Sequence, residues 1–186
     1  LCIQDELDLW SSKGFTSLWG IDVWGIYHVQ AVTKLDDDRL RRLLGLGPGV
    51  SCQGIRWLLG LTMPKYQIYS RCLKFYWTHW FFPRDKAVKG AMDSHWDMFR
   101  YGSTTAKKFA WTGRIVSLVK EIDPELRDQS DSEVIQILKG YKPQGTGQWV
   151  CMSPVEIEEL RARLFQRISI CNRVDVREQV FRNQTL

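Results

Sequence analysis

Three consecutive carboxylates, Asp36, Asp37 and Asp38, are the residues whose type most directly suggests chemistry, because Mg²⁺ and Ca²⁺ prefer oxygen ligands. Successive side chains on a helix point about 100° apart, so neighbours in the sequence do not converge on one ion. Negative charge is favoured in the first turn of a helix, where it faces the positive end of the helix dipole. We therefore expect the aspartates to lie in the first turn of a helix from Thr33, with arginines near its end and no metal site.

No other set of residues has the spacing of a catalytic or cofactor site. His79 and His95 lie sixteen positions apart without an H-E-x-x-H arrangement, so both are expected to be satisfied or exposed histidines. Nucleophile, phosphate-loop and dinucleotide fingerprints are absent, and the glycines in 45–49 form only half of a phosphate-binding pattern. The five cysteines are scattered without a C-x-x-C pair, which predicts neither a disulfide framework nor zinc and fits an intracellular, reducing compartment. The sequence thus predicts no cofactor and no enzyme activity carried by this chain alone.

Positive charge is concentrated in the middle of the chain. Residues 51–120 contain twelve basic and three acidic side chains, whereas acidic residues exceed basic ones by two in both 1–50 and 121–186. Lysine and arginine attract phosphates, and aromatic side chains, which are interleaved with them here, offer faces on which bases stack. This pattern predicts a surface that binds RNA or DNA. The alternative is that the aromatic residues form a core and the basic residues a solvated face.

The candidate nucleic-acid contacts are basic residues on neighbouring expected helices, together with one tryptophan. They are Arg39, Arg41, Arg42, Arg56, Lys65, Arg71, Lys74, Trp77, Lys107 and Lys108. No apolar run approaches the roughly 18 residues that a membrane span requires, so no membrane partner is expected.

Helical spacing of apolar residues predicts an all-α fold, an irregular bundle of about seven or eight helices. Ser51 is expected to cap a short helix, Pro64 to open a helix that ends at Pro83, and Ser130 and Ser153 to form capping boxes with the glutamates three positions later. The remaining helices are expected at 3–10, 15–32, 84–100 and from Ser103 or Thr104 to Asp123, and residues 142–150 are expected to be a loop. The helices would form two small subdomains, 1–102 and 103–186, or one continuous domain.

Four segments of the first half resemble, in order, the region after the polymerase palm in non-LTR (LINE-like) retrotransposon reverse transcriptases. Residues 18–25 (LWGIDVWG) are similar to the family's L-Y-G-x-E-x-W-G segment, and residues 40–46 (LRRLLGL) to its L-R-x-L-L-G-L. Residues 55–61 (IRWLLGL) are similar to L-x-x-E-L-G-x, and residues 68–77 to its R-x-x-K-F-W helix. Order and spacing fit over roughly residues 1–83, and the second half of the chain is only vaguely similar.

The resemblance implies the C-terminal thumb and linker region, which in such enzymes supports the primer–template and the element RNA. Trp19, Asp22 and Leu59 depart from the family's tyrosine and glutamates, and the palm's aspartate pair, the endonuclease residues and the zinc knuckle are not in this sequence. The sequence therefore predicts a non-catalytic nucleic-acid-binding helical module, either part of a larger polymerase or a separate protein derived from one. The alternative is a helical module for protein–protein interaction or self-association without nucleic-acid binding.

Overall fold

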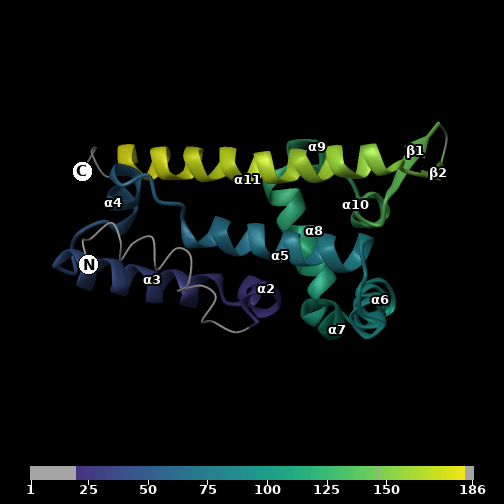
Figure 1. The fold of residues 1–186 in the computed structure, drawn as a ribbon, viewed down its shortest axis with the longest axis horizontal. Coiled ribbons are helices and arrows are strands. Elements are labelled where there is room, and N and C mark those ends of the chain that lie inside the picture. Colours follow the sequence, from purple (N-terminus) through teal and green to yellow (C-terminus); the bar gives the residue numbers. More distant parts are fainter. Residues whose placement is uncertain (1–19, 146, 183–186) are drawn as a thin grey trace. The chain divides into compact units, whose positions relative to one another are not determined.

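The computed structural model describes residues 20–145 and 147–182, and in this part the chain is helical apart from one small hairpin (Figure 1). The all-α prediction is therefore confirmed. The helix expected at 3–10 lies outside the described residues. The elements are α2 (Ile21–Trp24), a 3₁₀ turn η2 (Gly25–Tyr27), α3 (Val29–Leu44), α4 (Cys52–Leu58), α5 (Pro64–Phe81), α6 (Lys86–Tyr101), α7 (Thr104–Phe109), α8 (Trp111–Ile122), α9 (Pro124–Arg127), α10 (Asp131–Leu138), β1 (Tyr141–Gln144), β2 (Gln148–Cys151) and α11 (Pro154–Arg182).

The chain divides into two compact units, and one of them is discontinuous in sequence. The first unit contains residues 1–72 and 170–186, and the second contains residues 73–169. Both α5 and α11 contribute residues to each unit. The subdomain boundary expected at residue 102 falls within the second unit, between α6 and α7.

Of the single helix expected over 15–32, residues 15–19 lie outside the described residues, and the rest is interrupted by the 3₁₀ turn η2, so that α3 begins only at Val29. Gly25 permits this turn to pack closely, because a Cβ there would lie 2.7 Å from Cγ1 of Ile21 and 3.2 Å from Cγ2 of Ile68. Since α3 begins at Val29, the three aspartates at 36–38 lie in its middle. Their expected place in a first turn, and the helix-dipole explanation, are therefore wrong.

The helix-start signals of α4 and α5 are confirmed. The Ser51 hydroxyl accepts a hydrogen bond from the Gly54 amide at the start of α4, and α5 runs from Pro64 to Phe81. A small apolar cluster joins α3 to α4. It consists of Leu40 and Cys52 with Leu43, Leu44, Ile55 and Leu61 packed around them.

Residues of α11 complete the first unit at the start of α5. The side-chain oxygen of Asn172 accepts a hydrogen bond from the Met63 amide at 2.9 Å, and Tyr66 donates its hydroxyl proton to Asp175. Lys65 lies 3.9 Å from the same Asp175 carboxylate. These contacts join parts of the chain that are more than a hundred residues apart in sequence.

In the second unit, the helix expected from Ser103 to Asp123 is two helices, α7 and α8, separated at Ala110. His95 on α6 stabilises the break, because its Nδ1 accepts a hydrogen bond from the Trp111 amide at 3.2 Å. The backbone carbonyl of His95 also accepts a hydrogen bond from the Thr112 hydroxyl at 2.9 Å. His95 is thus a satisfied structural histidine, one of the two roles expected for it.

Buried Asp123 links three helices at the end of α8. Its Oδ1 accepts a hydrogen bond from the Glu125 amide and so caps α9, while its Oδ2 lies 3.1 Å from Nε of Arg163 on α11. Arg167, one turn further along α11, lies 4.0 Å from the same carboxylate. Two arginines therefore compensate one carboxylate that has no access to water.

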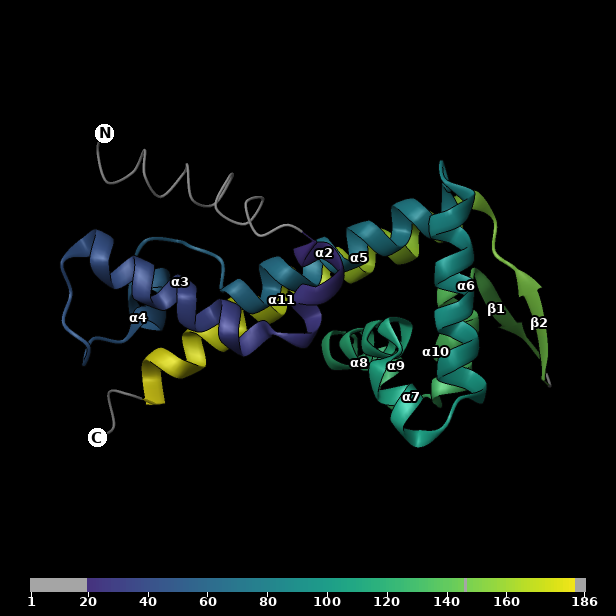
Figure 2. The same ribbon diagram turned by 90° about the horizontal axis from the view of Figure 1, so that it is seen from below.

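The capping boxes at Ser130 and Ser153 are confirmed at the starts of α10 and α11. Between these helices, the loop expected over 142–150 is instead an antiparallel hairpin in which Tyr141 pairs with Cys151 and Gln144 with Gln148. Figure 2 shows its two strands beside α10. Gly145 and Gly147 have positive φ angles of 62° and 82°, which allow the sharp reversal.

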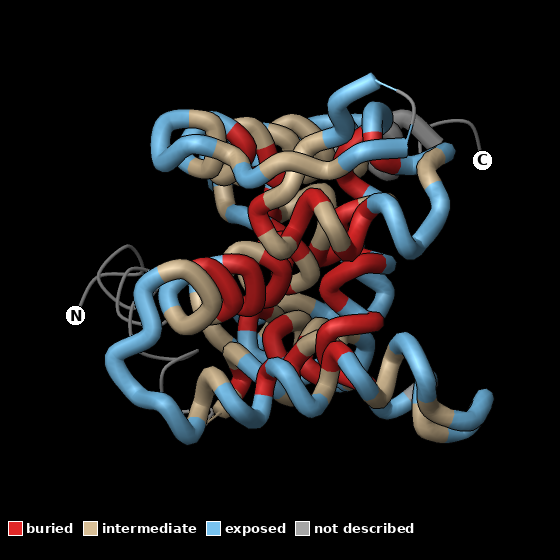
Figure 3. Tube along the Cα trace, turned by 90° about the vertical axis from the view of Figure 1, so that its right-hand side faces the viewer, coloured by how far each residue is buried: buried red, intermediate tan, exposed pale blue. Residues whose placement is uncertain are grey.

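The core of the second unit is formed by the apolar faces of α8, α10 and α11 together with aromatic residues of α5 and α6. Figure 3 shows the buried stretches (red) alternating with exposed ones (pale blue) along the helices. The fully buried residues of this core include Tyr76, Trp96, Ile115, Val119, Leu138 and Leu164.

Candidate nucleic-acid interface

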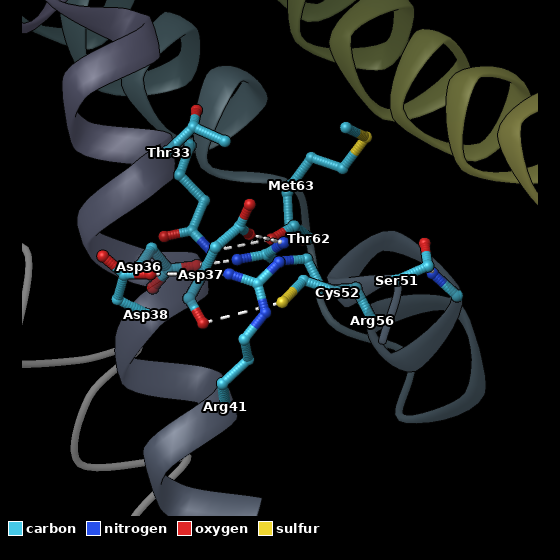
Figure 4. A network of polar contacts seen from close by, with 12 residues as sticks. Thr33, Asp36, Asp37, Asp38, Arg41, Ser51, Cys52, Arg56, Thr62 and Met63 are labelled. Atoms are coloured by element: carbon cyan, nitrogen blue, oxygen red, sulfur yellow. Dashed lines mark hydrogen bonds and ion pairs between the residues drawn. The ribbon is translucent and has the colours of Figure 1, made fainter. Parts of the chain in front are cut away.

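Arg56 is buried, with a side chain only 2% exposed, and it cannot contact a phosphate at the surface. Its guanidinium donates to Asp36 through Nη2 and to Asp37 through Nη1, both on α3 (Figure 4). Burial disfavours the charged form of Arg56, but the two carboxylates outweigh burial and raise its pKa above the ordinary value. Arg56 therefore holds α4 against α3, and its assignment as a nucleic-acid contact is corrected.

The same two helices share further polar contacts around Arg56. The Cys52 thiol donates to the backbone carbonyl of Asp37 at 3.6 Å, and Arg41 donates to Asp38 at 3.4 Å across one turn of α3. Each of the three aspartates thus has a partner within the chain (Figure 4). The acidic run serves the packing of the first unit.

Lys65 and Arg71 lie on α5 and are partly exposed, with acidic partners in the same unit. Lys65 lies near Asp175 on α11, and Arg71 lies 3.7 Å from Asp22 on α2. Ion pairs of this exposure contribute little to stability and open easily. Both cations could therefore exchange a carboxylate for a phosphate.

Trp77 is buried and offers no face to a base, so its assignment as a contact is also corrected. It packs against Tyr76 and Phe81 on α5. Tyr76 in turn contacts Trp96 edge-on at 6.1 Å and donates its hydroxyl proton to the Leu138 carbonyl at 2.7 Å. For these rings the core explanation is confirmed.

Four of the predicted cations are exposed. Arg39 and Arg42 lie on α3 in the first unit, while Lys74 on α5 and Lys107 on α7 belong to the second unit. Lys108 lies in α7, and its side chain is outside the description.

The end of α6 and the following helix α7 both carry exposed rings and exposed cations. Tyr101 is 72% exposed and Phe109 67% exposed, and Cζ of Arg100 lies 5.2 Å from the centre of the Tyr101 ring. We call the four residues Arg100, Tyr101, Lys107 and Phe109 the α6–α7 surface. Residues 82–114, which surround it, contain seven basic and three acidic side chains.

Of the α6–α7 surface, only Lys107 is among the nucleic-acid contacts predicted from the sequence. The sequence predicts a helix over 84–100 and another from Ser103 or Thr104, and this interruption is the signal that points to Arg100 and Tyr101. A ring at a helix end has fewer neighbours to cover it than a ring in the middle of a helix. The stacking residue predicted from the sequence, Trp77, lies within the long helix α5, where aromatic rings form part of the core.

Two further lysines, which are fifty positions apart in sequence, lie over the same indole in the second unit. Nζ of Lys89 on α6 lies 2.9 Å from the ring centre of Trp80, and Nζ of Lys139, just after α10, lies 5.7 Å from it. Lys139 also lies 5.5 Å from the ring centre of Trp96. Neither lysine was identified from the sequence, because only the fold brings them together.

No known family, curated protein or solved structure matches this chain. The resemblance to the retroelement thumb region stays a prediction from the sequence, and the function has to be argued from the surfaces themselves.

A groove of about 470 Å³ lies beside the start of α11, and its lining contains three acidic and two basic side chains. Its lining includes Arg163 paired with Glu125 and Lys142 paired with Glu156, together with apolar side chains. This groove offers no excess of positive charge to a nucleic acid.

Exposed apolar residues form a second kind of surface at the end of α4 in the first unit. Trp57, Leu58 and Leu59 are consecutive and all exposed, Leu58 by 74%. Such a concentration of exposed apolar area is typical of protein–protein contacts.

Within the described ranges, no three His, Cys, Asp or Glu side chains are grouped so that they could hold a metal ion. Among the helices of that part of the chain, none is both long enough and apolar enough to cross a membrane.

Proposed function

We propose that this chain is a helical module that binds single-stranded RNA or DNA, with the α6–α7 surface as its stacking platform. The observation that carries the proposal is the exposure of Tyr101 and Phe109 within a segment of net positive charge. An exposed ring is costly in water, but it stacks on an unpaired base, and the neighbouring cations attract the phosphates on either side of that base. In a duplex, the bases are already stacked on each other and cannot use the ring.

Arg100 adds to this platform because its guanidinium already lies over the Tyr101 ring. A planar guanidinium can stack on a base and donate hydrogen bonds to a phosphate at the same time. Lys107 supplies a second, point-like charge. Together they combine the two kinds of contact that sequence-tolerant single-strand binding requires.

Fluorescence polarisation with the whole chain tests the proposal on single-stranded RNA, single-stranded DNA, duplex and RNA–DNA hybrid. We expect Tyr101→Ala to lose about 1–3 kcal/mol of single-strand binding free energy, whereas Tyr101→Phe keeps the ring and most of the affinity. Lys107→Ala is expected to weaken binding and to lower the slope of log K against log salt by roughly 0.7. Arg127→Ala on α9 removes the same charge from another exposed site and serves as the control.

The proposal fails if none of the four nucleic acids binds at low salt. It also fails if Tyr101→Ala binds single strands as tightly as the unchanged chain.

A second candidate function is protein–protein interaction or self-association through Trp57, Leu58 and Leu59, supported by their consecutive exposure at the end of α4. Tryptophan is enriched among the residues that dominate interface energies. Sedimentation velocity of the chain and of Leu58→Lys tests self-association, with Leu35→Lys, another exposed leucine on α3, as the control. A loss of association in Leu58→Lys alone would favour this role, and a monomer at all concentrations would exclude self-association.

A further inference from the structure

Lys89 and Lys139 are held over Trp80 by contacts that fix all three residues. Trp80 stacks on Tyr76 with ring planes 7° apart and meets the Trp96 ring edge-on. The Tyr76 hydroxyl donates to the carbonyl of Leu138, which fixes the end of α10 one residue before Lys139. The Lys89 ammonium lies over the Trp80 ring and also 3.5 Å from the backbone carbonyl oxygen of Trp80.

The charged surroundings of the Lys89 ammonium are one carboxylate, that of Asp93, and the second ammonium, that of Lys139. Neither lysine forms an ion pair with any residue in the described part of the chain. Burial lowers the pKa of Lys89 below its ordinary value, Asp93 on the same helix opposes that shift, and the neighbouring charge of Lys139 adds to it. An anion bound beside these two like charges would offset their repulsion.

We propose that Lys89 and Lys139 form a binding site for a phosphate group, with Trp80 as its aromatic wall. A phosphate has several terminal oxygens, so one group can accept hydrogen bonds from two ammonium groups at once. The bound anion offsets the repulsion between the lysines and the cost of their partial burial. The site stands on its own geometry and holds whether or not the chain binds nucleic acid.

Two sources supply this chemistry, the backbone of a nucleic acid and a small phosphorylated molecule. In the first case the site would position a strand that also reaches the α6–α7 surface of the same unit. In the second it would hold a free phosphate ester, with the aromatic wall beside the ester group.

Nuclear magnetic resonance of the indole N–H groups in the whole chain tests the site with inorganic phosphate as the probe. We expect saturable shifts of the Trp80 and Trp96 signals with sodium phosphate and none with sodium chloride at the same ionic strength. Lys89→Gln or Lys139→Gln should weaken phosphate binding by roughly tenfold. Lys86→Gln, an exposed lysine on the same helix, is the matched control and should leave it unchanged.

Equal shifts with chloride, or unchanged phosphate binding in the Lys89→Gln, Lys139→Gln double variant, would overturn the inference. Dispersed indole signals of that variant in the absence of phosphate show whether it is folded. If the double variant is unfolded, the phosphate binding of the two single variants is used instead, and unchanged binding in both would overturn the inference.

Competition experiments distinguish the two sources. Displacement of phosphate by a single-stranded oligonucleotide, with weaker oligonucleotide binding in the double variant, supports a backbone phosphate. Displacement only by ribose 5-phosphate supports a small phosphorylated ligand. If an oligonucleotide binds the chain but phosphate does not bind at Trp80, this inference is overturned, whereas the proposed function still stands.

Discussion

A guanidinium enclosed by carboxylates has a different role from one on a surface, and Arg56 illustrates the difference. Removing one partner of a buried ion pair leaves the other charge without compensation, and this costs more than the pair itself contributes. Asp36 is buried and Asp37 partly so, and both depend on Arg56. At the scale of single residues, the largest effects on stability are therefore expected here.

We expect Arg56→Ala to lower the free energy of unfolding by about 3–5 kcal/mol, because the buried Asp36 carboxylate then loses the guanidinium that compensates its charge. Urea unfolding followed by circular dichroism measures the change. Combining Asp36→Leu with Arg56→Met should recover most of the loss, since an apolar pair can replace a buried ion pair. Arg42→Ala, an exposed change on α3, should stay within about 0.5 kcal/mol. A loss in Arg56→Ala as small as in Arg42→Ala would contradict the structural role.

At the scale of elements, two glycines inside helices have opposite surroundings. A Cβ at Gly113 in α8 would collide with the ring of Phe99 on α6, whereas a Cβ at Gly90 in α6 would meet nothing within 4 Å. The first glycine allows two helices to approach closely. The second has no packing role.

Gly113→Ala is expected to destabilise the chain by about 1–3 kcal/mol, because the Phe99 ring must move in a packed interior. Gly90→Ala is expected to stabilise it by up to about 1 kcal/mol through the better helix propensity of alanine. Chemical unfolding of the two variants gives the comparison, and stabilisation of both to the same extent would show that α6 and α8 do not pack as described.

The start of α11 gives a pH-dependent contribution to stability. The Lys142 ammonium, with the Ser153 amide and hydroxyl, lowers the pKa of Glu156 to about 2. A carboxylate whose pKa is lower in the folded than in the unfolded chain stabilises the fold above about pH 4.5 and loses this contribution as the pH falls towards 2.

We therefore expect the melting temperature of the unchanged chain to exceed that of Glu156→Gln at pH 6, with the difference narrowing between pH 4.5 and 2. Lys142→Met removes the strongest cause of the lowered pKa and should move this narrowing to higher pH. Calorimetry across this range measures both effects. A difference between the chain and Glu156→Gln that does not change with pH would contradict the prediction.

Elements with local signals could be predicted from the sequence, and those decided by distant contacts could not. Ser51, Ser130 and Ser153 mark helix starts through bonds to residues only three positions away. The break at Ala110 depends instead on His95 of another helix, and the hairpin at 141–151 has too few residues for a clear alternation of apolar and polar side chains.

The candidate site was harder to predict for the same reason. Charge and aromatic content located the basic third of the chain, but burial decides which side chain is available to a ligand. Arg56 and Trp77 have the right types and lie inside, whereas Tyr101 lies outside because a helix ends there. Lys89 and Lys139 meet only through the packing of α5, α6 and α10.

At the scale of the whole molecule, the first unit depends on residues from both ends of the described chain. Asn172 of α11 satisfies the buried amide of Met63 before α5, and Asp175 accepts the Tyr66 hydroxyl. The second unit is continuous and has no such requirement.

Asn172→Ala leaves the Met63 amide without an acceptor, and we expect a loss of about 1–3 kcal/mol in the first unit. Hydrogen exchange measured by mass spectrometry should show faster exchange at the start of α5 and unchanged protection in α8 and α10. Asn172→Asp keeps an oxygen at the same position and should retain most of the protection. Equal loss of protection in α8 would show that the effect is not confined to the first unit.

The contact between Asn172 and Met63 also sets an order of events during synthesis on the ribosome. Its two residues are separated by 109 positions, whereas all of the second unit, residues 73–169, is made before Asn172. Protein synthesis usually lets the N-terminal part fold first. Here the first unit starts earlier in the chain but is completed only when α11 has been made. Met63 and Tyr66 therefore lack their contacts with α11 during a period in which the second unit already has time to fold.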